Sequence, residues 1–190
     1  MSELMERIQK EGLLDLNRHA TLLADIDSIA ETAGIPVSSI YHSMKEVCTL
    51  DELKFARDLW LDPKTAGVVY IHDVYTMPRM MAVTAACLRN FVDARIILMA
   101  EIVRAIKEGN APKCDVVLIP NFCIAAKDKG IADWEMTHVL GWMLDRHFSG
   151  LKTLVSISKK EDVQKVMGQM MIDHLKNFVE IPAGILPTAK

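Results

Sequence analysis

The sequence predicts an α/β fold with a five-stranded, mainly parallel sheet that carries helices on both faces. Short apolar segments alternate with amphipathic helical segments over most of the chain. The apolar segments are continuous, which is typical of strands that are buried on both faces of a parallel sheet. The 190 residues are 51% hydrophobic and 25% charged, which is the composition of a globular protein with a sizeable core.

The N-terminal residues 1–33 are expected to form an amphipathic helical arm. Their apolar residues recur at helical spacing, and Gly34 and Pro36 then interrupt the pattern. We therefore expect two parts, the arm and a domain of residues 34–190. The stripe that would bind a partner consists of Leu4, Ile8, Leu13 and Leu14. Such a stripe either enters a groove of another protein or packs on its own domain, and the sequence leaves both open.

The remaining elements follow from periodicity and from capping residues. Thr49 with Glu52 three residues later forms a capping box, which predicts a helix that Pro63 ends. Strands are expected at 67–71, 95–99, 114–119 and 152–157, with an edge strand at 178–181. Further helices are expected at 79–91, 100–108, 133–148 with Asp133 as the N-cap, and 161–177.

Charge and cysteine usage exclude several classes of protein. The net charge of -3 provides no basic surface for non-specific nucleic-acid binding. No apolar run approaches the roughly 20 residues that span a bilayer, and the charged N-terminus is unlike a signal peptide. The four cysteines show no C-x-x-C spacing, so we expect no metal site and a cytoplasmic location.

The segment "GVVYIHDVYTMPRMMAVTAACL", residues 67–88, has the strand–loop–helix outline of a phosphate-binding loop. Such a loop needs G-x-x-x-x-G-K-[ST], in which backbone N–H groups and the lysine hold phosphates and the hydroxyl holds magnesium. In this register the glycine positions hold His72 and Met77, the lysine position Pro78, and the hydroxyl position Arg79. Proline supplies neither an N–H group nor a charge, although it suits the start of a helix.

The order of features over residues 34–175 resembles the DnaC/IstB-type AAA+ ATPases, which include helicase loaders and transposition helpers. The resemblance is carried, besides residues 67–88, by "AGIPVSSIYHSMKEV", "LKFARDLWLDP", "RIILMAEIVRAIKEG", "CDVVLIPNF" and "IADWEMTHVLGWMLDRHFSGLKTLVSIS". It implies an AAA+-like (P-loop NTPase) domain that lacks the small helical lid.

The resemblance also assigns the other nucleotide-site positions. The Walker B acids correspond to Pro120 and Asn121, the sensor to Ser158, and the arginine-finger positions to Met170 and His174. Phosphoryl transfer depends on positioning and charge neutralisation, and the lysine, both acids and the arginines are missing. The implied protein has no catalytic residues and no cofactor: it is a pseudo-ATPase.

Without a catalytic role, the function that the resemblance implies is binding to another protein. The resemblance implies a role in DNA replication, encoded by a phage or mobile element, in which the chain binds the replicative DNA helicase or an active AAA+ relative, as a loader or an inhibitor. Oligomerisation and indirect nucleic-acid contact are compatible with it. The alternative is a divergent but active ATPase that uses ATP and magnesium. A third option is a small-molecule pocket at His72, Asp73 and Asn121.

Several of these residues have more than one interpretation. Arg79 either binds phosphate at a helix N-terminus or is solvated or salt-bridged. His72 and Asp73 either form a catalytic dyad or merely follow a strand. Met77 either fills the vacated nucleotide pocket or packs in the core.

Overall fold

A computed structural model describes residues 14, 15, 17–58, 64–71, 76–122 and 132–182 of the chain. Within them, five strands form one sheet in the order β2-β3-β4-β1-β5. Every pairing is parallel, so the prediction of a five-stranded, mainly parallel sheet is confirmed. The strands are β1 (Gly67–Ile71), β2 (Ala94–Ile96), β3 (Val116–Ile119), β4 (Lys152–Ile157) and β5 (Phe178–Pro182).

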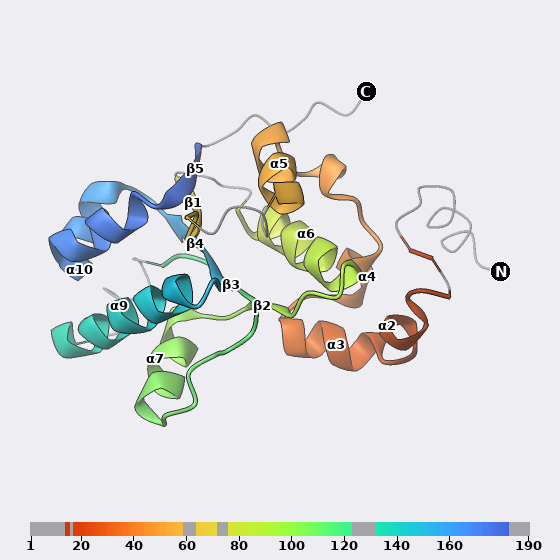
Figure 1. Ribbon diagram of the computed structural model, residues 1–190, viewed down its shortest axis with the longest axis horizontal. Helices are drawn as coiled ribbons and strands as arrows, with labels where there is room; N and C mark the ends of the chain where they lie inside the picture. The colour runs from red at the N-terminus through yellow and green to blue at the C-terminus, as the bar shows by residue number, and fades with distance from the viewer. Residues whose placement is uncertain (1–13, 16, 59–63, 72–75, 123–131, 183–190) are drawn as a thin grey trace.

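Helices cover both faces of this sheet (Figure 1). One face carries α7 (Met99–Lys107), α9 (Asp133–Phe148) and α10 (Lys160–Leu175). The other carries α5 (Leu50–Asp58) and α6 (Thr76–Arg89), with η1 (Met44–Glu46) beside them. Beyond α6 lie α2 (Ala20–Ala24), α3 (Ile26–Ala33) and α4 (Val37–Ile40).

The strands supply side chains to both layers because successive residues of a strand point to opposite faces. In β1, Val69 belongs to the cluster under α9 and α10, whereas Val68 and Tyr70 belong to the cluster under α5 and α6. All residues of β3 are buried. The continuous apolar strands are thus explained by burial on both faces.

The N-terminal region departs from the expected single helix. Leu14 and Asp15 are not helical, residues 17–19 form a turn, and two short helices follow. The Asp15 carboxylate accepts hydrogen bonds from the backbone N–H groups of Asn17 and Arg18, a local alternative to helical bonding. The prediction of one continuous helix is therefore wrong for the described residues.

Two glycines mark places where backbones meet closely. A Cβ atom on Gly67 would lie 1.6 Å from the carbonyl oxygen of Thr153, so only glycine fits where β1 begins its pairing with β4. Gly34 ends α3 with φ +70, and a Cβ there would lie 2.7 Å from the carbonyl oxygen of Ile96. The end of α3 is therefore pressed against β2, the edge strand of the sheet.

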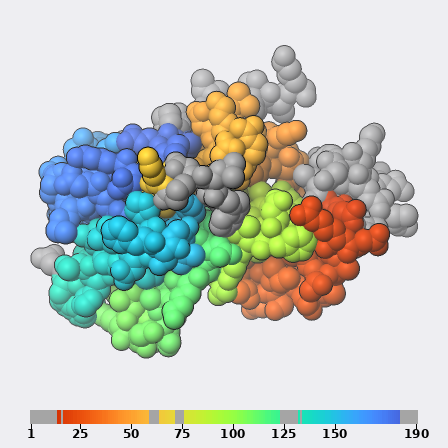
Figure 2. Space-filling view, viewed as in Figure 1, coloured from red at the N-terminus to blue at the C-terminus, as the bar shows by residue number. Residues whose placement is uncertain are grey.

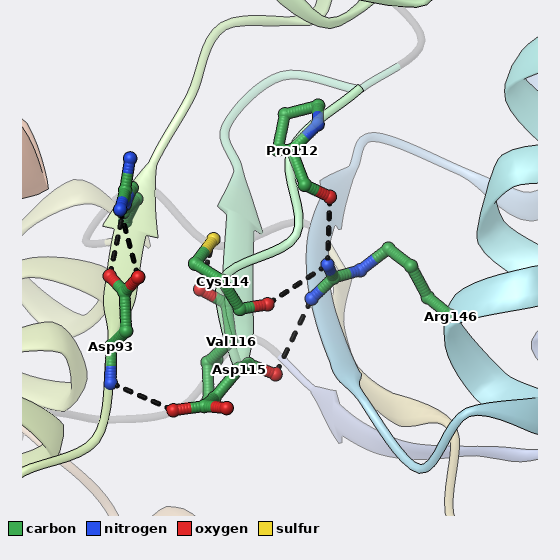
Figure 3. A network of polar contacts seen from close by, with 7 residues as sticks. Asp93, Pro112, Cys114, Asp115, Val116 and Arg146 are labelled. Carbon is green, nitrogen blue, oxygen red and sulfur yellow. Dashed lines mark hydrogen bonds and ion pairs between the residues drawn. The ribbon is translucent and has the colours of Figure 1, made fainter. Parts of the chain in front are cut away.

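Arg146 of α9 fastens that helix to the beginnings of two strands. Its side chain is 3% exposed. Its guanidinium donates hydrogen bonds toward the carbonyl oxygens of Pro112, Cys114 and Asp115 (Figure 3). It also donates to the carbonyl oxygen of Lys152 at 2.7 Å and to the Thr153 hydroxyl at 3.2 Å. A buried cation is thus stabilised by backbone and hydroxyl oxygens.

Two other boundaries differ from expectation. The N-cap of α9 is Ala132 rather than Asp133, and its backbone N–H donates to the Glu135 carboxylate at 2.7 Å. In α10 the helix is broken at Gly168, whose φ of 79° and ψ of 178° are not helical.

Candidate functional site

The carboxyl ends of β1, β3 and β4 lie at one edge of the sheet, where ligands bind in open α/β folds. Ile71 pairs in register with Ile157, and Ile119 pairs with Val155. Pro120, Asn121 and Ser158, which follow β3 and β4, therefore share this edge. His72 and Asp73 lie outside the described residues, so the dyad and the small-molecule pocket stay untested.

The helix that would follow a phosphate-binding loop begins three residues earlier than expected. Thr76 is the first residue of α6, Met77 the second and Pro78 the third. Proline is tolerated there because the first four N–H groups of a helix have no partner within the helix. Pro78 is exposed and Met77 is half-buried.

Arg79 lies in the core. Its side chain is 0% exposed, and its Nη1 lies 3.7 Å from Oε2 of Glu52, which is 1% exposed. The same carboxylate oxygen accepts hydrogen bonds from the backbone N–H of Thr49 at 2.7 Å and from the Thr49 hydroxyl at 3.1 Å. Of the interpretations open for Arg79, the structure contains the salt-bridged one. The guanidinium is directed into the protein and its charge is paired.

Tyr70 of β1 belongs to the same buried region. Burial and then the Glu52 carboxylate hold the pKa of the Tyr70 hydroxyl well above its usual value. Glu52 was predicted only as part of a capping box, and the acceptance of the Thr49 N–H confirms that part. Its ion pair with Arg79 was not predicted, because a capping pattern does not reveal which buried cation the carboxylate contacts.

The Walker B position contains a backbone connection between β3 and β4. Pro120 is buried, and Asn121 is exposed with a left-handed φ of 52°, which asparagine tolerates better than most residues. The Asn121 N–H donates to Oγ of Ser156 at 2.7 Å. The next N–H, that of Phe122, donates to the carbonyl oxygen of Ser156 at 2.8 Å.

These contacts bury an apolar side chain directly after the two positions that correspond to the Walker B acids. Phe122 is 0% exposed and packs in the cluster that includes Met136 and Val139 of α9. Neither Pro120 nor Asn121 carries a carboxylate, and Ser158 is half-buried just past β4. The hydrogen bonds of Ser156 to the turn after β3 were not predicted, although a hydroxyl inside the apolar strand "KTLVSI" was a signal for such a contact.

His174 does not join this edge of the sheet. It lies near the beginnings of β1 and β5, where the Ala66 N–H donates to the carbonyl oxygen of Asn177. Its ring is 5.3 Å from that of Phe178 and 5.6 Å from that of His147, and it is 5% exposed. The buried imidazole carries no arginine side chain to a surface, and the assignment of His174 to an arginine-finger position stays a prediction from the resemblance. Met170, the other such position, is exposed.

The arm positions are only partly described. Leu4, Ile8 and Leu13 lie outside the described residues. Leu14 is 3% exposed and packs in a cluster with Leu22, Ile40 and Ala85. Of the two options that the sequence left open for the stripe, Leu14 shows packing on its own domain, and partner binding by the stripe stays a prediction.

The described residues contain neither a metal cluster nor a membrane span. No three of their histidine, cysteine, aspartate or glutamate side chains gather as metal ligands. None of their helices is both long and apolar enough to cross a bilayer.

No protein-family model matches the chain, and no curated protein matches its sequence. Solved structures do match its fold. Domain III of the replication initiation protein DnaA from Thermotoga maritima has a TM-score of 0.54 at 13% identity, over 70% of this chain and 60% of that one. AMPPCP-bound DnaA from Aquifex aeolicus has a TM-score of 0.56 at 5% identity, over 75% of this chain and 50% of that one.

A third similar structure matches along most of its length. It is a candidate primosome component from Streptococcus pyogenes serotype M3, with a TM-score of 0.57 at 11% identity, over 82% of this chain and 94% of that one. This chain spans less than two thirds of either DnaA chain. The expected five-stranded parallel sheet with helices on both faces is confirmed, and the chain shares its fold with domain III of the Thermotoga maritima replication initiation protein and with this primosome component.

Proposed function

We propose that this chain is a DnaC-like protein of DNA replication that has lost ATPase activity. It acts by binding the replicative DNA helicase or an active AAA+ relative, as a loader or an inhibitor. The fold similarity to replication initiation proteins and the ordered motifs of residues 34–175 support this proposal.

The observation that carries the proposal is the buried pair of Arg79 and Glu52. A triphosphate with magnesium needs a lysine and a hydroxyl at the start of the helix and acidic groups after β3. The basic residue in the first turn of α6 is Arg79, whose guanidinium lies 3.7 Å from Glu52 in the core. After β3 the chain carries Pro120 and Asn121. The basic residue in the first turn of α6 is thus paired with a carboxylate in the core, and the positions after β3 carry no acidic group.

Titration with a fluorescent ATP analogue tests the loss of nucleotide binding. We expect no saturable signal up to millimolar analogue with or without magnesium, beside a P-loop ATPase as positive control. Saturable, magnesium-dependent binding near physiological concentrations would instead support the alternative, a divergent but active ATPase.

A pulldown with the hexameric replicative helicase of the native host tests the partner. We expect recovery of the helicase, and its loss in the variant Leu4→Asp/Ile8→Asp, because a charge disrupts an apolar helix-in-groove contact. Leu50→Asp is the matched control, since Leu50 is an exposed leucine on α5, outside the arm. Recovery of metabolic enzymes alone would contradict the proposal.

A further inference from the structure

The C-terminus of α6 has an unusual residue at a position that normally requires glycine. The Val92 N–H donates to the carbonyl oxygen of Cys87, and the Phe91 N–H donates to that of Leu88. These two bonds define a Schellman motif, in which the residue after the cap adopts a left-handed conformation. That residue is Phe91, with φ 61°. A bulky residue there costs free energy that glycine avoids, so its side chain must provide a compensating contact.

The compensating contacts come from the N-terminal segment. The ring of His19 stacks on that of Phe91 at 5.3 Å and 10°. The guanidinium of Arg18 lies 5.4 Å from the centre of the same ring. Nε2 of His19 also donates to the carbonyl oxygen of Arg89, the last residue of α6, at 2.7 Å. Three contacts from two adjacent residues therefore meet at the end of α6.

These contacts hold a segment with little stability of its own. The helix α2 has five residues, too few for an isolated helix in water. The N-terminal segment is anchored by two leucines, Leu14 before α2 and Leu22 within it, which are buried in the cluster that includes Ala85 of α6. Figure 2 shows the N-terminal helices, in red and orange, seated against the yellow-green α6.

Phe91 remains accessible from outside. It is 56% exposed and lines a groove of about 380 Å³ beside Leu22, Ile29 and Arg95. The ring is thus both the contact that holds the segment and a contact that another protein can reach.

We propose that Arg18, His19 and Phe91 form a latch that keeps Leu14 and residues 17–24 closed on α6 and withholds Leu14 and Leu22 from a partner. The inference rests on the proposed function, in that the partner is the protein that docks the N-terminal stripe. Its chemistry is that of an apolar groove, which takes the leucines once the latch opens. Docking affinity is then reduced by the fraction of molecules in which the segment is closed.

The variant Phe91→Gly tests the latch in the full chain by amide hydrogen exchange. Glycine relieves the left-handed strain and removes both ring contacts. We expect exchange of residues 17–24 to accelerate roughly tenfold, while the amides of α6 exchange at an unchanged or slower rate. Arg18→Ala, at an exposed residue, is expected to accelerate the same amides by a smaller factor. Unchanged exchange of residues 17–24 in both variants would overturn the latch.

Phe148→Ala is the matched control. Phe148 is also exposed and stacked on a histidine, at 6.0 Å and 10° from His147, but it lies at the end of α9. Its removal is expected to leave exchange of residues 17–24 unchanged.

Binding to the host's hexameric replicative helicase separates the latch from the proposed function. If both hold, Phe91→Gly binds the helicase more tightly, by up to the factor by which exchange accelerates. Faster exchange with no helicase binding by either protein supports the latch and refutes the proposed partner. Faster exchange with equal binding by both proteins overturns the claim that the latch controls docking.

Discussion

Nη1 of Arg79 lies 3.7 Å from Oε2 of Glu52, and neither side chain reaches solvent. The pair joins the first turn of α6 to the first turn of α5. A buried ion pair adds little net stability, because desolvation offsets the attraction, but an isolated buried charge is costly. The effect of replacing either residue on the free energy of unfolding is therefore expected to depend on whether the other residue is present.

Removing one partner of this pair should destabilise the fold more than removing both. We expect Arg79→Met to lower the free energy of unfolding by about 3–5 kcal/mol, because the Glu52 carboxylate would stay buried without its cation. The double variant Glu52→Leu/Arg79→Met should lose less free energy of unfolding than the single variant Arg79→Met, and less than the sum of the losses in Glu52→Leu and Arg79→Met. Urea denaturation of four proteins, namely the natural chain, the two single variants and the double variant, measures this coupling. Additive losses would show that the two charges do not interact.

His174 should make the fold sensitive to acid. Burial, and secondarily the neighbouring His147, lowers the pKa of His174 to about 4, against about 6.5 in the unfolded chain. The unfolded state then binds more protons between these values, so stability falls as the pH drops from about 6.5 to about 4. We expect about 2–3 kcal/mol of this loss to come from His174.

The variant His174→Phe should flatten the pH dependence, because phenylalanine fills the site beside Phe178 and does not titrate. Thermal unfolding between pH 4 and pH 7 measures the slope. His42→Gln, at an exposed histidine, serves as the control and should keep the acid sensitivity of the natural chain. An equal slope in the His174 variant and the natural chain would assign the sensitivity to other groups.

Replacing Arg146 should loosen the strand starts that it bridges. Arg146→Met removes five hydrogen bonds, to Pro112, Cys114, Asp115, Lys152 and Thr153. We expect a loss of about 3–5 kcal/mol, since buried carbonyl oxygens lose a charged donor. Denaturant unfolding measures the loss, and Arg104→Met on the exposed side of α7 should stay within about 0.5 kcal/mol.

Gly67 and Gly141 offer a matched pair of glycine-to-alanine changes. In Gly67→Ala the new methyl group would meet the carbonyl oxygen of Thr153 at 1.6 Å, so β1 cannot keep its pairing with β4. We expect insoluble or unfolded protein. A Cβ on Gly141 in α9 meets nothing within 4 Å. Gly141→Ala should therefore stabilise the helix by roughly 0.5–1 kcal/mol. Circular dichroism during thermal unfolding compares the two.

The strands were the most predictable part of the fold. The bounds of β1 and β4 agree with the sequence prediction, because burial on both faces leaves an uninterrupted apolar run. The start of α6 was misplaced because Pro78 was taken for a first helical residue, whereas the third position of a helix also needs no N–H donor. The arm was misread since apolar spacing does not reveal that Asp15 satisfies the backbone locally.

The candidate site was less predictable than the fold. The resemblance assigned Pro120, Asn121 and Ser158 to nucleotide-site positions, and the parallel pairing of β1, β3 and β4 brings them to one edge of the sheet. Sequence spacing did not show that the Arg79 side chain faces the core. An arginine that follows the position of the phosphate-binding lysine can equally lie on the surface. It also did not place His174, because burial of an imidazole depends on its neighbours in space.

The strand order has a consequence for synthesis on the ribosome. β1 lies between β4 and β5, which are translated last among the five described strands, and it pairs with neither β2 nor β3. A nascent chain therefore carries Val68, Val69 and Tyr70 without a strand partner until β4 has emerged, and with one open side until β5 has emerged, which favours chaperone capture. Chains that terminate before Phe178 leave one side of β1 open to other polypeptides.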